Sequence, residues 1–229
     1  SCWDWRFLFL LVFSTLLDYY SGLQIERSSS ERLRKFWFWL SIGINLGFLG
    51  VFKYFNFFIE NVHDFLQQIG FNSPKNILSI ILPLGISFYS FRMIGYLLDV
   101  RNKKIKEIPT LLEYSVFVAY FPTMISGPID RAVPFVKQIN VKRDFSSESF
   151  SDGLRQLLWG LFKKLVVADT IATITSPIFE NYSTLNGSAL FIGSVLYFIQ
   201  LYADFSGYSD MAIGISKLLG IKVHINFKF

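Results

Sequence analysis

The segment YADFSGYSD carries two carboxylates and four hydroxyls inside an otherwise apolar stretch. Its polar side chains are Tyr202, Asp204, Ser206, Tyr208, Ser209 and Asp210. At about 100° per residue, Asp204 and Tyr208 fall on one face of a helix and the other four fall on the opposite side. Because a helix that is polar on both sides cannot face lipid there, it must be buried in protein, line a hydrated cavity or unwind at Gly207.

We expect these six side chains to line a hydrated path for a substrate. Carboxylates at membrane depth are costly unless they are hydrogen-bonded or hydrated. The neighbouring serine and tyrosine hydroxyls can donate hydrogen bonds to Asp204 and Asp210. The alternative is a hydrogen-bond cluster that only stabilises the fold.

A second candidate is the segment FVAYFPTMISGPI, in which Pro122 and the pair Gly127 and Pro128 interrupt helical hydrogen bonding. Broken backbone is tolerated at membrane depth only where protein or a water-filled cavity satisfies its polar groups. We therefore expect Ser126, Gly127 and Pro128 to line the same path, in a re-entrant segment over residues 111–129. The alternative is an ordinary membrane span with a kink.

A third candidate is Arg92, in the run PLGISFYSFRMIGYLLDV. Pro83 and Gly85 loosen a helix here, and the hydroxyls of the run can satisfy freed backbone groups or line a passage. Helix packing through small residues explains the same composition. Both interpretations stay open at this point.

The other ionisable residues of the apolar runs have no motif around them. Asp18 and Lys53 are expected at opposite membrane interfaces, without a function, and no role is assigned to Asp169. His63, in a predicted external loop, and His224 are expected to be surface or interfacial residues rather than catalysts.

Several classes of function are excluded by what the sequence lacks. It has no Walker loop, no dinucleotide-binding fingerprint, no G-x-S-x-G elbow and no paired-histidine metal motif. Its single cysteine, Cys2, excludes an internal disulfide and any multi-cysteine metal site. The net charge of +5 comes from clusters between apolar runs, which indicates membrane orientation rather than nucleic-acid binding.

The elements that position these residues are membrane helices. Of 229 residues, 52% are hydrophobic and only 17% are charged, whereas a soluble domain carries about 25% charged residues. A span needs about 20 mostly apolar residues. The candidate segments are residues 7–23, 36–58, 77–98, 111–129, 150–179 and 189–203, with a further apolar helix over 211–221. We therefore predict an all-α, polytopic transmembrane bundle, with residues 1–229 forming part of one domain truncated at both ends.

Loop charges give the topology. Lys and Arg gather in residues 27–35, 101–106 and 131–143, whereas residues 60–76 hold one and residues 180–188 none. The positive-inside rule places all three basic loops in the cytoplasm only if residues 111–129 are re-entrant. At the end of the polar stretch 141–153, Ser151 or Asp152 is expected to cap the N-terminus of the helix that follows. The basic side chains there, Arg155, Lys163 and Lys164, are expected to snorkel to the interface.

Four motifs occur in an order that resembles the membrane-bound O-acyltransferase family, specifically its alginate O-acetyltransferase branch. They are VFKYFNFF, ILPLGISFYSFRMIGYLLDV, YFPTMISGPIDR and LYADFSGYSDMAIGISKLLGI, and the opening WDWRFLFLLVFSTLLDYYSG is similar to the same branch. The resemblance covers nearly the whole chain.

The resemblance implies a funnel-shaped helical bundle in the inner cell membrane. There a histidine would activate a hydroxyl for acyl transfer. The acyl group would come from a cytoplasmic donor such as acetyl-CoA, with no bound cofactor. It would pass to an exported polysaccharide such as alginate, directly or through an acyltransferase partner on the outer side. Members are longer than this chain, and their active-site histidine is expected beyond Phe229. Neither histidine of the chain matches it, so we expect the chain alone to be inactive.

Two other functions stay open. Within the family, the alternative is D-alanyl transfer to teichoic acid. From a different class, the alternative is a channel or flippase-like transporter that moves a polymer or a lipid without acylating it.

The predicted topology can be tested by labelling single cysteines in a full-length protein without Cys2. Residues introduced into 101–106 and into 131–143 should both react only from the cytoplasmic side, because both loops are basic. Labelling of the two loops from opposite sides would remove the re-entrant segment.

Overall fold

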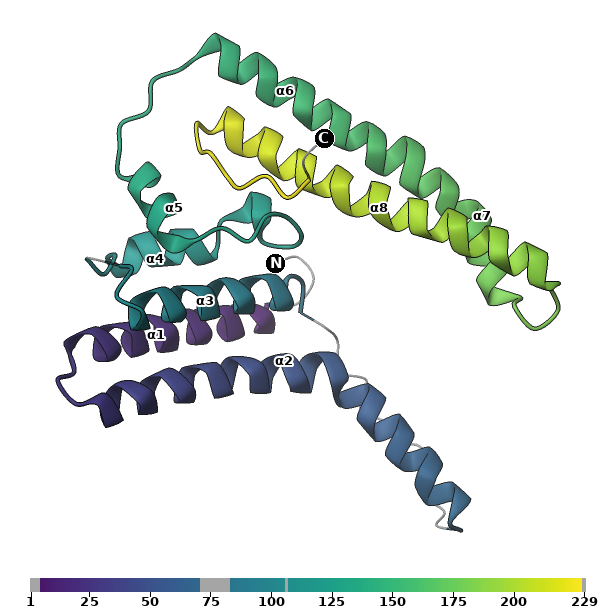
Figure 1. The fold of residues 1–229 in the computed structure, drawn as a ribbon, viewed down its shortest axis with the longest axis horizontal. Helices are drawn as coiled ribbons and strands as arrows, with labels where there is room; N and C mark the ends of the chain where they lie inside the picture. The colour runs from purple at the N-terminus through teal and green to yellow at the C-terminus, as the bar shows by residue number, and fades with distance from the viewer. Residues whose placement is uncertain (1–4, 71–82, 106, 228–229) are drawn as a thin grey trace. The chain divides into compact units, whose positions relative to one another are not determined.

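A computed structural model describes residues 5–70, 83–105 and 107–227 (Figure 1). Cys2, Lys75, Lys106 and residues 77–82 of a predicted span lie outside the described residues. The described residues form helices, turns and loops and contain no strand, so the prediction of an all-α fold is confirmed. The chain divides into two compact units, Ser1–Ala119 and Tyr120–Phe229, which are described separately. That both belong to one membrane domain stays a prediction.

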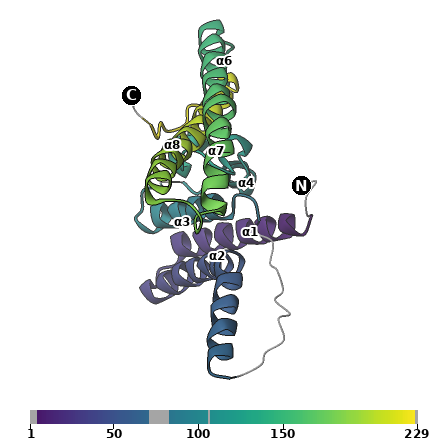
Figure 2. The ribbon, with the colours of Figure 1, turned by 90° about the vertical axis from the view of Figure 1, so that its right-hand side faces the viewer.

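The first unit holds α1 (Arg6–Arg27), α2 (Glu31–Gln68), α3 (Ile86–Arg101) and α4 (Leu111–Val118). Helix α1 lies alongside α2 and α3 (Figures 1 and 2). Apolar side chains without interior proline favour long helices here, and α1 joins α2 through the short link 28–30. The Arg34 Nε donates to the carbonyl oxygen of Ile25 at 3.1 Å, which satisfies a free carbonyl in the last turn of α1. The fully buried core includes Ile25, Met93 and Leu97.

Helix α2 is longer than its predicted span. It passes the predicted end at residue 58 and continues to Gln68. Its 38 residues correspond to a helix about 57 Å long. The first part of the predicted loop 60–76 is therefore helical. His63 lies on this helix with its side chain buried, so its predicted loop and surface position is wrong.

The two short helices of this unit begin at recognisable signals. Helix α3 begins only at Ile86, because Gly85 adopts a left-handed conformation with φ of 74°. Helix α4 begins with a capping box: the Thr110 side chain accepts from the Glu113 amide, and the Glu113 carboxylate accepts from the Thr110 amide. Both helices have fewer residues than the roughly 20 that a crossing needs.

The predicted break after α4 is confirmed. The helix ends at Val118, a single 3-10 turn covers Phe121–Thr123, and residues 124–131 are not helical. A continuous, kinked span over residues 111–129 is therefore wrong. The side of the membrane from which this segment enters stays a prediction.

The second unit contains α5 (Ala132–Ile139), which sequence reasoning did not foresee, and two long antiparallel rods. The first, the helical rod, runs without interruption through α6 (Ser147–Leu161), the π-helix η2 (Phe162–Ala168) and α7 (Asp169–Glu180). The second is α8 (Gly187–Leu218), which lies alongside the helical rod (Figures 1 and 2).

Two predicted details of these rods are wrong. Ser146 caps α6 by accepting from the amide of Ser149, so Ser151 and Asp152 lie inside the helix. Residues 189–203 and 211–221 do not form two helices, because α8 runs through both segments. The alternative that the chain unwinds at Gly207 is also excluded, because α8 is continuous there.

Four glycines bring the two rods together: Gly153, Gly160, Gly207 and Gly214. Each helix spaces its pair by seven residues, and the antiparallel arrangement sets Gly153 against Gly214 and Gly160 against Gly207. An ideal Cβ on Gly160 would lie 2.5 Å from the Gly207 carbonyl oxygen, and one on Gly207 would lie 2.9 Å from the Gly160 carbonyl oxygen. Small residues permit this close backbone approach, and we call these four residues the glycine seam.

In the part of the chain that the structure describes, three helices are long and apolar enough to cross a membrane. They are α1 over Phe7–Arg27, α2 over Glu31–Gln68 and α8 over Gly187–Leu218. The corresponding predicted spans 7–23, 36–58 and 189–203 lie within these helices. The predicted segments 111–129 and 150–179 do not form single α-helices.

The glycine seam predicts a large difference between two glycine substitutions in the full-length protein. Gly160→Ala should lower the free energy of unfolding in detergent by about 1–3 kcal/mol, because its Cβ would collide with backbone. Gly187→Ala is the matched control, since no atom lies within 4 Å of its ideal Cβ. Equal effects in a denaturant titration would show that the seam does not limit packing.

Candidate functional site

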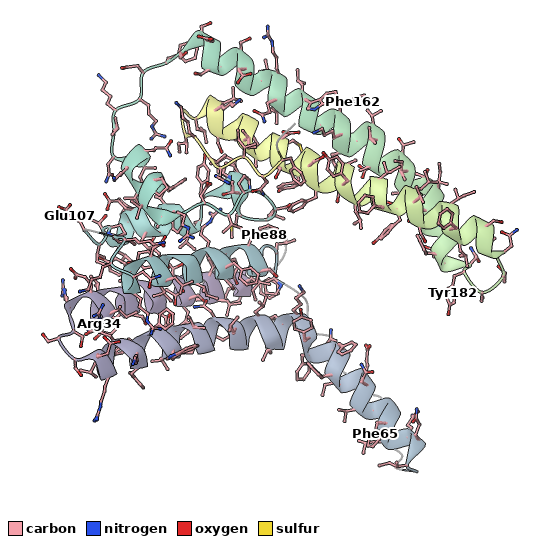
Figure 3. The ribbon with its side chains drawn as sticks, in the orientation of Figure 1. Arg34, Phe65, Phe88, Glu107, Phe162 and Tyr182 are labelled. Carbon is pink, nitrogen blue, oxygen red and sulfur yellow. The ribbon has the colours of Figure 1, made fainter. Side chains whose placement is uncertain are left out.

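The polar segment of α8 lies against the π-helix η2 of the helical rod. Figure 3 labels Phe162, the first residue of η2, on the rod that runs beside α8. A π-helix is a wider turn than an α-helix and occurs frequently at functional sites. Here it carries two consecutive lysines, Lys163 and Lys164, at the level of Asp204 and Asp210.

Lys163 and Asp210 form a buried ion pair. The Lys163 Nζ lies 2.7 Å from the Asp210 Oδ2, and their side chains are only 10% and 8% exposed. The Gln156 Nε2 donates to the other oxygen, Oδ1, at 3.1 Å. Both carboxylate oxygens are therefore occupied by donors from the helical rod, which offsets the cost of burying the charge.

Lys164 pairs with carboxylates at a wetter position. Its Nζ lies 2.6 Å from the Asp204 Oδ1 and 2.9 Å from the Asp169 Oδ1. The Lys164 side chain is 35% exposed and that of Asp204 is 49% exposed. Water competes for such a pair, so it contributes about 1 kcal/mol at most. Its groups are accessible in a way that Asp210 is not.

Gly207 separates the two ion pairs. Its ideal Cβ would lie 3.0 Å from the Lys163 Cβ and 3.1 Å from the Lys164 backbone nitrogen. The backbone of η2 therefore sits directly over Gly207, and the two lysines reach Asp210 and Asp204 on its two sides. A larger residue at position 207 would push η2 away from both carboxylates.

The donors to the two carboxylates differ from those predicted. Ser206 donates to the Ala203 carbonyl oxygen of its own helix, and the buried Ser209 hydroxyl has no partner among the described residues. Tyr202 is half exposed and its ring contacts that of Phe227. The hydroxyls of Tyr202, Ser206 and Ser209 thus do not hold Asp204 or Asp210, and Tyr208 is half-buried.

Lys163 and Lys164 are the residues of the candidate site that sequence reasoning misplaced. They were expected to snorkel to the interface, but both turn toward α8. The available signal was the pair of consecutive lysines in LWGLFKKLVVADT, facing a carboxylate-bearing apolar segment elsewhere in the chain. Asp169, to which no role was assigned, shares Lys164 with Asp204.

The broken segment also packs on α8. Gly127 and Pro128 are buried, and an ideal Cβ on Gly127 would lie 3.4 Å from the Cβ of Ala212. The Tyr120 hydroxyl donates to the Ser216 Oγ at 3.0 Å, one turn further along α8. The structure therefore brings two of the predicted parts of the site onto one helix. Ser126 is only half-buried.

Arg92 belongs to the first unit, where it supports the end of α4. Its Nη1 donates to the Phe117 carbonyl oxygen at 2.9 Å, and its guanidinium lies 5.4 Å from the centre of the Phe117 ring. A cation is favourable at a helix C-terminus because free carbonyls accumulate there. Arg92 thus fixes the point at which the chain leaves the helix. Its predicted place on a substrate path stays a prediction.

The expectation that Asp18 is interfacial is wrong. Its carboxylate is fully buried between α1 and α2, where it accepts from the Ser41 hydroxyl and from the Asn45 Nδ2 at 2.8 and 2.9 Å. Ser41 and Asn45 are one turn apart on α2, a spacing that could have predicted one polar face. Lys53 instead lies over the ring of Tyr54.

The two ion pairs predict unequal costs when one partner is removed. Lys163→Met should destabilise the full-length protein by about 3–5 kcal/mol, because it leaves Asp210 buried and unpaired. Lys163→Met combined with Asp210→Leu should recover most of that loss. Lys164→Met is the control on the half-exposed pair and should cost about 1 kcal/mol or less.

Unfolding in detergent, followed by tryptophan fluorescence, measures these differences. Equal losses for the two single lysine variants, or no recovery in the double variant, would contradict the assignment of a buried pair.

Comparison with known proteins gives a consistent set of relatives. No protein-family model matches the chain. A probable alginate O-acetylase, AlgI, of Pseudomonas putida is 36% identical over 227 residues, which cover 98% of this chain and 46% of that protein. A peptidoglycan O-acetyltransferase of Helicobacter pylori is 33% identical, over 98% of this chain and 47% of its own length.

A teichoic acid D-alanyltransferase of Lacticaseibacillus rhamnosus is also similar. It is 29% identical over 95% of this chain and 52% of its own length. The chain thus spans about half the length of the curated relatives that it matches.

Proposed function

Because this chain belongs to the membrane-bound O-acyltransferase family, we propose that the full-length protein transfers an acyl group to hydroxyls of an exported polysaccharide. The observation that carries the proposal is the 36% identity to an alginate O-acetylase, which runs along 98% of the chain rather than through one motif. The helices long enough to cross a membrane fit an enzyme that works in a bilayer.

The names of the relatives support a polymer of the cell envelope as the acceptor. They refer to alginate, peptidoglycan and teichoic acid. Two of these names specify an O-acetyl group, so we propose acetyl as the acyl group, a cytoplasmic donor such as acetyl-CoA, and alginate or a similar polysaccharide as the acceptor. D-alanyl transfer to teichoic acid is the second candidate, on the similarity at 29% identity.

We place the protein in the inner membrane as a multi-pass enzyme, with an acyltransferase partner on the outer side. The general base would be a histidine outside this chain, because neither histidine of the chain matches the position that the family resemblance implies. Such a base must lie within reach of the hydroxyl that it deprotonates. The part described here would build the acyl path around α8 and the broken segment after α4.

The two carboxylates of α8 differ in what they can contribute to that path. Asp210 is buried and occupied by Lys163 and Gln156, so it holds the helices and is not free to take a proton. Asp204 is half exposed and salt-bridged to Lys164, so it can interact with water and with a passing polar group. Asp204 is therefore the carboxylate that we propose borders the hydrated path.

This difference gives the test of the proposed function. In cells that depend on the full-length protein for acetylation, Asp204→Asn should lower the acetyl content of the polysaccharide several-fold at normal protein abundance. Asp210→Asn should lower both the acetyl content and the protein abundance, because it disturbs a buried ion pair. Acetyl content is measured on the purified polymer, and abundance in the membrane fraction.

Asp169→Asn is the matched control. It removes the other carboxylate from Lys164 and leaves the contact with Asp204 in place, so acetylation should stay normal. Normal acetylation by Asp204→Asn would remove that residue from the path. Export of polymer that never becomes acylated, even with the unaltered protein, would support the transporter instead.

A further inference from the structure

A cavity of about 710 Å³ lies in the second unit at the C-terminal end of α8, away from the two ion pairs with Asp204 and Asp210. Three stretches of chain form it: residues 143–152, which include the start of α6, residues 213–219 at the end of α8, and residues 220–225 that follow. Its volume is within the range that accommodates an organic ligand. The proposed acyl transfer assigns no role to this cavity.

Each of the three stretches contributes one cation to the cavity: Arg143, Lys217 and Lys222. Two carboxylates, Asp144 and Asp152, also line it. Lys217 is paired with Asp152, so these two charges compensate one another. Of the other charged residues that line the cavity, Arg143 and Lys222 are positive and Asp144 is negative, so the net charge of the lining is positive.

The positions of the two remaining cations are fixed by the fold. The Arg143 Nη1 donates to the Leu219 carbonyl oxygen at 3.1 Å, and its aliphatic stem packs on Gly220, whose φ is +70°. This glycine ends α8 in a Schellman motif, in which the Gly220 amide donates to the Lys217 carbonyl oxygen and the Ile221 amide to the Ser216 carbonyl oxygen. Arg143 therefore sits on a rigid turn.

Lys222 is held by its backbone alone. Its amide donates to the Gln138 Oε1 at 2.7 Å, and its carbonyl oxygen accepts from the Gln138 Nε2 at 3.0 Å. Within the described ranges its ammonium group has no hydrogen bond or ion pair. The backbone is thus positioned while the charge is left available for a ligand.

The remaining walls of the cavity are apolar and partly exposed. Phe145 and Phe150 form one side, with ring centres 5.7 Å apart, and Ile225 contributes from the opposite stretch. All three side chains are well exposed, and Phe145 is 81% exposed. A ligand with both an anionic group and an apolar chain matches this combination better than a small anion does.

We infer that this cavity binds an anionic phospholipid, with the headgroup phosphate between Arg143 and Lys222 and an acyl chain along Phe145, Phe150 and Ile225. Phosphate suits both cations, since guanidinium and ammonium groups donate charge-assisted hydrogen bonds to its oxygens. Such a lipid is within reach because α8, which ends at the cavity, is long enough to span a bilayer. Basic sites at the ends of spans recognise anionic headgroups.

The inference can be tested with the full-length protein in nanodiscs of phosphatidylcholine that contain spin-labelled phosphatidylglycerol. Lys222→Gln should lower the preference for phosphatidylglycerol over phosphatidylcholine about fivefold, the loss expected for one lysine near a lipid headgroup. Lys222→Arg should retain the preference. Lys142→Gln is the matched control, because this exposed lysine directly precedes Arg143 in the sequence but does not line the cavity.

Two results would overturn the inference. One is an unchanged lipid preference in Lys222→Gln. The other is displacement of the labelled lipid by inorganic phosphate at equal concentration, which would identify a site for soluble phosphate esters. The assay needs no acyl transfer, so a failure here leaves the proposed enzyme untouched, and an inactive enzyme leaves the lipid measurement intact.

Discussion

The close approach of α8 to the helical rod is the constraint on which the second unit depends. Where two backbones meet through glycines, a carbonyl oxygen of one helix occupies the place that a Cβ would take on the other. This contact leaves no room for side chains between the two rods. The polar side chains of both rods therefore point to the two sides of the contact. The lysines of η2 and the carboxylates of α8 meet there because the glycine seam has already fixed the distance between their helices.

The same constraint separates the two carboxylates chemically. Asp210 lies on the side where Lys163 and Gln156 of the helical rod cover it, and Asp204 lies on the side that stays open. Two identical groups six residues apart on one helix thus differ in hydration and freedom. This difference makes one of them a buried structural contact and leaves the other accessible to water.

The sequence was sufficient for much of the fold, because apolar runs and helix breakers act locally. The long helices were found from hydropathy, and Pro122 with Gly127 predicted the end of regular structure after α4. Unwinding at Gly207 was only one of the alternatives left open, and it does not occur: a residue that can loosen an isolated helix permits tight packing once a second backbone lies against it. Partners also escaped prediction, since Lys163 and Asp210 are 47 residues apart and their meeting depends on tertiary packing. Asp18 was misplaced for the same reason, because its donors Ser41 and Asn45 come from the next helix.

The π-helix has a consequence for the whole length of the helical rod. An α-helix of 34 residues slowly turns its contact stripe away from a straight neighbour, and the extra residue in a π-turn resets that phase. Beyond η2 the rod still faces α8: Thr175 donates to the Gln200 Oε1 at 2.5 Å, and Ile178 covers Gly193. Removing a single residue from η2 would rotate α7 by about 100° about its axis and turn both contacts away. The number of residues in η2 is therefore as restricted as their types, because a change in that number would have to be offset by a matching change in the register of α8.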